Sequence, residues 1–279
     1  MATTTISQTT AAPQARATTG AASTALAAAT LWWREIVRFY RQPARVVGVV
    51  ASPLLFWIVI GSGFGSSFRA PSGGGAHYLE YFFPGALIMI VLFTSIFTMM
   101  SVIEDRREGF LLSVMVAPIP RASIVLGKVL GGTSLATIQG LVFLALAPAI
   151  GVRFGLEQFL WMVLIVFLVA FALTALGFAV AWTLDSTQAF HAIINLFLLP
   201  LWLLSGALFP LAGASGWVRL LMEINPLTYG VESLRATLFP AAPATFALST
   251  SLGVLAGFSA VVFLVAYALA NRRTTFPAA

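Results

Sequence analysis

The chain has 279 residues, of which 59% are hydrophobic and 9% are charged, and its formal net charge is +6. Soluble domains carry about 25% charged residues, so this composition excludes an ordinary soluble protein and places the chain in a membrane. The apolar stretches are continuous and long enough for spanning helices of about 20 residues, whereas barrel strands alternate apolar and polar residues. The chain has no cysteine, which excludes disulfides and thiolate metal sites.

Residues 1–30 are rich in Ala and Thr and lack the apolar core of a signal peptide, so they predict a disordered cytoplasmic tail. Residues 31–45, LWWREIVRFYRQPAR, predict an amphipathic helix in the membrane interface. At about 100° per residue its arginines share one face and its aromatic residues the other. These arginines either set only the topology or also face a cytoplasmic partner; they are Arg34, Arg38, Arg41 and Arg45.

The rest of the chain predicts an all-α integral membrane domain over residues 46–270, followed by a cytoplasmic tail over 271–279. Six spans are expected, at residues 46–64, 81–103, 124–150, 159–184, 189–211 and 245–270. With the N-terminus inside, eleven arginines and lysines fall in inner segments and four in outer loops. This bias predicts that both termini are cytoplasmic.

A dense charge cluster, EDRRE, follows the second span at residues 104–108. Each of these residues would cost about 2.5–3.5 kcal/mol at the centre of a membrane helix, so the cluster is expected on the cytoplasmic side. Gly109 and a short apolar helix, FLLSVMV, come next, and Pro118 and Pro120 end it. Solvated linker charges are the simple interpretation. An exposed apolar helix with a charged rim is instead typical of a docking element.

The stretch EDRREGFLLSVMVAPIPRASIVLGKVLGG resembles the cytoplasmic segment of ABC type-2 permeases, the membrane subunits of one class of ABC exporter. In that family a Glu- and Arg-rich stretch and a Gly precede a short helix, a Pro-containing turn and a Gly-Lys pair. Three further stretches agree in order: RQPARVVGVVASPLLFWIVIGSGFG, YLEYFFPGAL and INPLTYGVESLRATLF. The resemblance covers residues 31–273.

This resemblance implies a permease subunit that is not itself an enzyme and binds no cofactor, with ATP and magnesium on a separate cytoplasmic ABC ATPase subunit. It also implies a second permease copy, identical or related, and a place in the bacterial plasma (inner) membrane, with no nucleic-acid partner. The segment 104–122 would dock on the ATPase. Its coupling residues would be Glu104, Asp105, Arg106, Arg107, Glu108, Gly109, Phe110, Leu111, Pro118 and Arg121.

The chain's own Gly-Lys pair does not form a phosphate-binding loop. Ala122 stands where the first glycine of that loop would be, and Val129 replaces its Ser or Thr. Gly127 and Gly131 instead predict close helix packing, either within the bundle or at a dimer contact. No cluster of metal ligands is apparent in the sequence.

Polar residues at the start of the fifth span, from Asp185 to Asn195, share one helix face. They form either an interhelical hydrogen-bond network or the entrance of a substrate pathway. Hydroxyls in the second span are weaker candidates, because they can bond to carbonyls of their own helix. The candidate pathway residues are Thr94, Phe97, Thr98, His191 and Asn195.

Residues 205–240 contain two short amphipathic pieces separated by Asn225 and Pro226. They predict a re-entrant helical hairpin on the outer side, as in the family, that restricts the exit. The alternative is a surface helix that seals the top of a dimer. Glu232 and Arg235 can pair on one turn. The residues assigned to this segment are Asn225, Pro226, Tyr229, Glu232 and Arg235.

The sequence therefore predicts an ATP-driven exporter subunit that moves a hydrophobic drug, lipid or glycan-type substrate outward by alternating access. The alternative is a secondary transporter or channel without an ATPase. That class would have charged residues at mid-membrane and broken helices in repeated positions, and neither is apparent.

Overall fold

The computed structural model describes residues 21–64, 78–117, 119–241 and 244–272, and within these ranges the chain is helical, with no strand. Three short turns of other helix types are η2 (Ala147–Ile150), η3 (Leu203–Ala207) and η4 (Leu211–Gly213). The α-helices are α1 (Ala21–Tyr40), α2 (Pro43–Phe64), α3 (Tyr78–Thr98), α4 (Met100–Arg107), α5 (Phe110–Val116), α6 (Arg121–Leu144), α7 (Leu156–Thr183), α8 (Thr187–Trp202), α9 (Gly216–Ile224), α10 (Pro226–Leu238) and α11 (Leu248–Asn271).

Six helical segments of the described chain are long and apolar enough to cross a membrane, which confirms the predicted number of spans. They are Val46–Phe64, Tyr78–Arg107, Arg121–Ile150, Leu156–Thr183, Thr187–Ala207 and Leu248–Asn271. The second, third and fourth begin three residues before the predicted starts. The protein is a multi-pass α-helical membrane protein.

Helix α1 begins at Ala21, so residues 21–30, which the sequence analysis assigned to the disordered tail, are helical. The physical reason is that alanine has the highest intrinsic helix propensity, so an Ala-rich segment of low hydrophobicity still forms a helix when it can pack. Residues 1–20 lie outside the described part of the chain.

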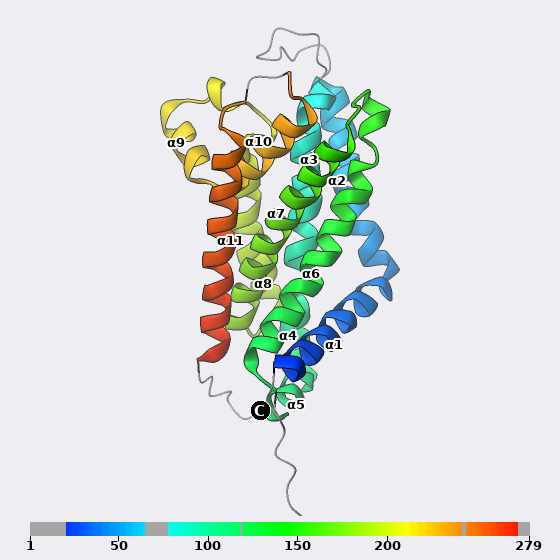
Figure 1. Ribbon diagram of the computed structural model, residues 1–279, viewed down its shortest axis with the longest axis vertical. Coiled ribbons are helices and arrows are strands. Elements are labelled where there is room, and N and C mark those ends of the chain that lie inside the picture. The colour runs from blue at the N-terminus through cyan, green and yellow to red at the C-terminus, as the bar shows by residue number, and fades with distance from the viewer. Residues whose placement is uncertain (1–20, 65–77, 118, 242–243, 273–279) are drawn as a thin grey trace, which may run out of the picture.

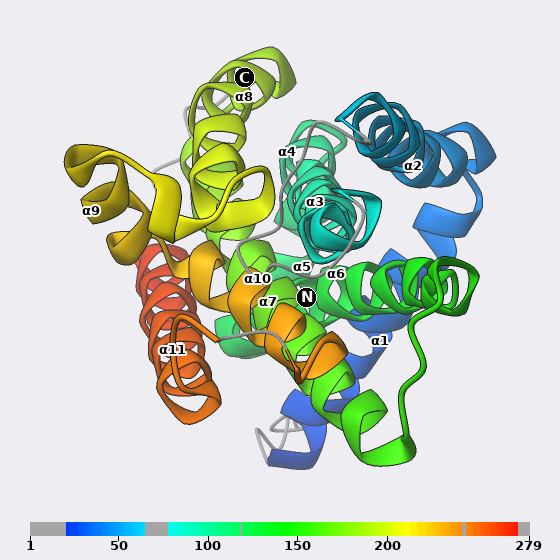
Figure 2. The same cartoon turned by 90° about the horizontal axis from the view of Figure 1, so that it is seen from above.

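The spans form a bundle in which α3, α6 and α7 make up most of the core (Figure 1). Seen along the bundle, α2 and α8 lie at the outside with α3 and α4 between them (Figure 2). Helices α4 and α5 lie at one end of the bundle, where α1 crosses it, and α9 and α10 lie at the other (Figure 1).

Helix α1 packs closely on α6 because two glycines leave room for it. A Cβ on Gly127 would lie 2.7 Å from the carbonyl oxygen of Ala28, and one on Gly131 would lie 2.8 Å from the Cβ of Glu35. Small residues let helix backbones approach each other. For this glycine pair, packing within the bundle is confirmed.

Candidate functional site

The charge cluster lies on α4, a two-turn helix that continues from α3 after a break at Met99. The chain leaves α4 through Gly109, whose φ of +75° is a conformation that favours glycine, and then enters α5. The sequence thus builds a helix–turn–helix in which consecutive charged residues of α4 point in different directions.

Asp105 is fully buried and accepts hydrogen bonds from three cationic side chains that come from other helices. Arg34 of α1 binds both of its oxygens, at 2.7 and 2.9 Å, and Arg38 of α1 binds Oδ1 at 2.7 Å. Lys128 of α6 is the third donor. The hydrogen bonds that Arg34 donates to Asp105 raise the pKa of Arg34 above its ordinary value. Asp105 therefore joins α4 to α1 and α6 by charge.

Lys128 is 1% exposed and holds the same network together from α6. Its three N–H groups each have an acceptor: Glu35 Oε1 at 2.6 Å, Ser101 Oγ at 3.1 Å, and Asp105. Ser101 in turn donates to Glu35 Oε2 at 2.7 Å. A compact ammonium with three donors suits such a site. Buried ion pairs are stable only when every partner is satisfied in this way.

Six charged side chains make up this network, three acidic and three basic, so it is electrically balanced. Glu35, Asp105 and Lys128 are buried, whereas the other three are 19–31% exposed. Glu104, which pairs with Arg38, completes it at the edge. We call this set the acidic lock; it consists of Glu35, Glu104, Asp105, Arg34, Arg38 and Lys128.

The two arginines of α4 bind a different part of the chain, the turn between α7 and α8. Arg106 donates to the carbonyl oxygens of Trp182 at 2.6 Å and Leu184 at 3.1 Å, and pairs with Asp185 at 2.8 Å. Arg107 Nε donates to the carbonyl oxygen of Asp185 at 3.0 Å. We call these contacts of Arg106 and Arg107 with residues 182–185 the basic latch.

A part of the predicted coupling segment remains on the surface. Arg107 and Glu108 are exposed, and on α5 Leu112 is 49% and Val116 is 87% exposed. Leu111 is buried. These exposed side chains are available to a partner, whereas Asp105 is occupied within the chain.

The other residues predicted for this region have structural contacts of their own. Phe110 lies under the Arg34 guanidinium at 3.7 Å from its ring centre. Arg121 donates to carbonyl oxygens of Ala270 and Arg272, both at 3.1 Å, and so caps the last turn of α11. Arg41 is exposed. Pro118 and the side chain of Arg45 lie outside what the structure describes.

Sequence reasoning missed Glu35 and Lys128 as members of the site. Lys128 carried one usable signal, because it is the sole lysine of the chain. Glu35 carried a second, because it is a single acid among the arginines of α1. Neither signal names the partner, since Glu35 and Lys128 are 93 residues apart in the sequence.

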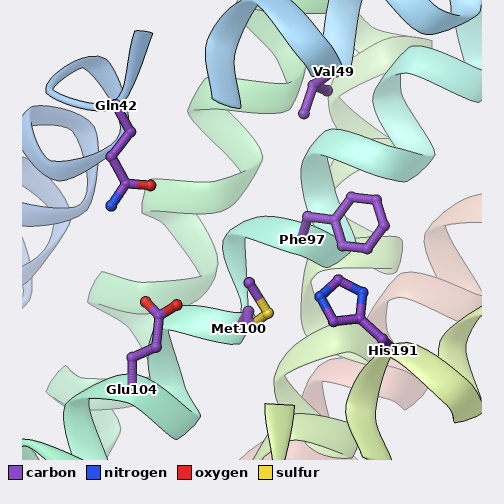
Figure 3. A pocket seen from close by; sticks show the side chains of 6 residues that line it. All are labelled: Gln42, Val49, Phe97, Met100, Glu104 and His191. Atoms are coloured by element: carbon purple, nitrogen blue, oxygen red, sulfur yellow. The ribbon is translucent and has the colours of Figure 1, made fainter. Parts of the chain in front are cut away.

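A cleft of about 320 Å³ lies beside the acidic lock, between α2, the α3–α4 junction and α8. The rings of Phe97 and His191 face each other with centroids 5.2 Å apart. Figure 3 shows these two rings on one side of the cleft and Gln42 and Glu104 on the other. The lining residues are Gln42, Val49, Phe97, Met100, Glu104 and His191.

The structure brings together two of the five predicted pathway residues, Phe97 and His191. Thr94 is buried and bonds to Gln139 at 2.6 Å, and Thr98 donates to the carbonyl oxygen of Thr94 at 2.6 Å. Asn195 lies on the exposed side of α8. Because the threonine hydroxyls have acceptors within the bundle, they do not line the cleft.

At the other end of the bundle, α9 and α10 correspond to the two amphipathic pieces expected in residues 205–240. Their side chains bind carbonyl oxygens that are released where α8 ends in the irregular turn η3. Asn225 donates to Leu201 at 2.6 Å, Arg235 donates to Gly206 at 2.9 Å, and Tyr81 of α3 donates to Gly206 at 3.1 Å. A membrane offers no water to such carbonyls, so these side chains stabilise the break in α8.

The remaining candidate residues of α9 and α10 support the same arrangement. Arg235 also pairs with Glu232 and lies over the Tyr81 ring, 4.3 Å from its centre. Tyr229 donates to the carbonyl oxygen of Glu223 at 2.8 Å, which closes the turn between α9 and α10. Pro226 is the first residue of α10, where its missing N–H costs nothing.

Replacing Gly206 by Ala is expected to destabilise this break in α8. Gly206 has a φ of +77°, and a side chain in the left-handed conformation costs about 1–2 kcal/mol. Gly213→Ala is the matched control, because Gly213 has open space around it and is not among the glycines of positive φ. Equilibrium unfolding in mixed detergent micelles measures the stability of both variants. Equal losses of stability would contradict the requirement for glycine at position 206.

Comparisons with known proteins agree with this architecture. The ABC-2 type transporter family model matches residues 27–239. The chain is 28% identical to the putative transport permease ycf38 of Cyanophora paradoxa over 228 residues, 81% of this chain and 78% of the relative. It is 25% identical to the inner membrane transport permease YadH of Escherichia coli K12, over 87% of this chain and 94% of the relative.

A third relative is the daunorubicin resistance ABC transporter permease protein DrrB1 of Streptomyces coeruleorubidus. The identity is 22% over 218 residues, 73% of this chain and 71% of the relative. The family match covers most of the chain, including the acidic lock, the cleft and the outer helices. The protein therefore belongs to the ABC-2 type transporter family and is a membrane permease subunit of an ABC transporter.

Proposed function

We propose that this permease exports a hydrophobic drug, lipid or glycan-type substrate, driven by a separate cytoplasmic ATPase that docks on α5. The observation that carries the proposal is the exposed apolar pair Leu112 and Val116 on a seven-residue helix at the end of the bundle. Exposed Arg107 and Glu108 precede it. An apolar patch with a charged rim is a common form of protein-docking site.

Movement of α5 would be transmitted to the spans through α4. Helix α5 follows α4 after two residues, Glu108 and Gly109. Helix α4 is joined to α1 and α6 by the acidic lock and to the α7–α8 turn by the basic latch. An ATPase that moves α5 therefore moves several spans together. Both termini are cytoplasmic in this proposal, as the distribution of arginines predicts.

The substrate would enter at the cleft. Its apolar and aromatic lining, with one carboxylate and one imidazole, suits an amphipathic molecule. The name of DrrB1 associates that relative with daunorubicin resistance, which supports a drug-like substrate among the classes considered. Helices α2 and α8, which both contribute to the cleft, also expose apolar side chains, among them Val59 and Phe197, on which a second permease copy would pack.

Val116→Asp tests the docking surface. Burial of a valine contributes about 1.5–3 kcal/mol, so its loss and the added charge are expected to weaken ATPase binding at least about 10-fold. The permease is co-expressed with an ABC ATPase subunit of the same organism, and binding is measured by co-purification and by ATP hydrolysis in lipid nanodiscs.

Leu156→Asp is the matched control, because Leu156 is 75% exposed at the start of α7, in a different element. It is expected to leave ATPase binding unchanged. Equal binding by the Val116 variant and the wild type would refute the docking surface. Absence of any ATPase association with the wild type would refute the exporter proposal as a whole.

A further inference from the structure

The two halves of the EDRRE cluster hold different parts of the bundle, and they differ in how firmly they hold them. The centre of the acidic lock is buried: Glu35, Asp105 and Lys128 are each 2% exposed or less. In the basic latch, Arg106 is 12% exposed, but the carboxylate of its partner Asp185 is 85% exposed. Exposed ion pairs are weak because water and salt compete for both partners, whereas breaking a buried pair leaves an uncompensated charge.

Helix α1 is fixed to α6 in a second way, by the glycine notches at Gly127 and Gly131. The lock and the notches together tie α1, α4 and α6 into one body. Helix α5 follows that body, because it is joined to α4 and to α6 by short connections.

Helix α8 is held by different kinds of contact at its two ends. It packs through a narrow stripe of buried residues four apart: Phe190, Ile194, Leu198 and Trp202. At the outer end, Trp202 is 1% exposed and donates from Nε1 to the carbonyl oxygen of Gly85 at 2.8 Å. At the inner end, the α7–α8 turn is held by the basic latch, and His191 meets Phe97 at the edge of the cleft.

We propose that the basic latch is the contact that opens during transport, so that the inner end of α8 swings away from the body formed by α1, α4 and α6. Helix α8 pivots about its outer end at Trp202. This swing separates His191 from Phe97 and widens the cleft. The inference rests on the proposed function for its driving force, since ATPase movement of α5 reaches the latch through α4.

The acidic lock stays closed in this cycle. Arg106 and Arg107 are then positioning residues that set when the cleft is open. The adjacent acids Glu104 and Asp105 keep α4 attached to α1 and α6 throughout. The change of sign between Asp105 and Arg106 thus separates a permanent contact from a releasable one.

The test uses pairs of spin labels, because the chain has no native cysteine. Thr30→Cys with Gln188→Cys reports the distance from α1 to the inner end of α8, and both sites are exposed. Thr30→Cys with Ile138→Cys reports the distance from α1 to α6 within the body. Double electron–electron resonance is recorded in nanodiscs, with labelled chains diluted by unlabelled ones.

The first arm uses the permease alone and removes the latch with Arg106→Gln plus Arg107→Gln. In this variant we expect a second population with a longer α1–α8 distance beside the wild-type distance, while the α1–α6 distance stays the same. Asp185→Asn, which removes an exposed carboxylate and no buried charge, is expected to shift the α1–α8 distance in the same direction. Arg153→Gln plus Arg219→Gln is the matched control, since both arginines are exposed outside the latch, and it is expected to change neither distance.

The second arm uses the complex with its ATPase, without nucleotide and trapped with ATP and vanadate. The two states are expected to differ in the α1–α8 distance and to agree in the α1–α6 distance. If the α1–α8 distance changes neither between wild type and the arginine variant nor between the two states of the complex, the latch is overturned. Equal shifts in both distances would overturn the rigid body.

The two proposals fail in different ways. If no ATPase associates, the exporter function fails, and the first arm still decides whether the arginines hold α8. If the ATPase binds and hydrolyses ATP but neither arm shows a shift, the docking proposal stands and the latch is wrong.

Discussion

Replacing Asp105 by Asn is expected to lower the free energy of unfolding by about 3–5 kcal/mol, the cost of breaking a buried ion pair. Asp105 is 0% exposed and accepts hydrogen bonds from Arg34, Arg38 and Lys128, so its loss leaves three cations with two remaining acids. The amide can satisfy part of the hydrogen bonding but supplies no charge. Equilibrium unfolding in mixed detergent micelles measures the effect.

Two further variants make this result specific. Asp185→Asn removes an acid that is 85% exposed, and it is expected to cost at most about 1 kcal/mol. Asp105→Asn combined with Lys128→Met removes one charge of each sign from the lock. The double variant is expected to be more stable than the sum of the two single variants predicts, because the residues contact each other. Strict additivity would show that the two charges do not stabilise each other.

Gly127→Leu is expected to displace α1 from α6. Even a Cβ at this position would lie 2.6 Å from the Cβ of Leu31 and 2.7 Å from the carbonyl oxygen of Ala28, and the backbone of α1 cannot yield locally. Overpacking of this kind costs about 1–3 kcal/mol, and the displaced helix would also draw Arg34 and Glu35 out of the acidic lock. We therefore expect an effect at or above the upper end of that range.

Gly257→Leu is the control for the glycine substitution, because Gly257 lies in the spanning helix α11 with open space around it. Leucine also has the higher helix propensity, so this variant is expected to be neutral or slightly stabilising. Hydrogen exchange of the α1 amides separates local displacement from general destabilisation. The packing described for this contact would be contradicted if the α1 amides exchanged faster in Gly257→Leu. It would also be contradicted if their exchange rate did not increase in Gly127→Leu.

The sequence was a reliable guide to the spans and to the two short helices α9 and α10. Continuous apolar runs fix where helices can cross a membrane, because a charge at mid-membrane is too costly. The α9–α10 turn was predicted from Asn225 and Pro226, since a proline ends one helix and starts the next. Here local chemistry is sufficient, and the structure agrees to within a few residues.

The charge cluster shows where local chemistry is insufficient. Its position after the second span and its short apolar helix could be predicted from the pattern. The division of the cluster between the acidic lock and the basic latch could not be predicted, because each set of contacts depends on distant segments. Asp105 binds Arg34 at a separation of 71 residues, and Arg106 binds Asp185 at a separation of 79. A charged side chain at the end of a span has the same sequence signal whether it faces water or a buried partner.

By itself the sequence determined that this protein is an all-α membrane protein with six spans and a charged segment after the second. It also carried the resemblance to the family that the comparisons established. Only the tertiary structure decided that Asp105 and Lys128 are buried together with Glu35, and that Phe97 and His191 meet at one cleft. The physical reason is range: hydropathy and helix propensity act within a segment, whereas burial and charge pairing depend on which segments the fold brings into contact.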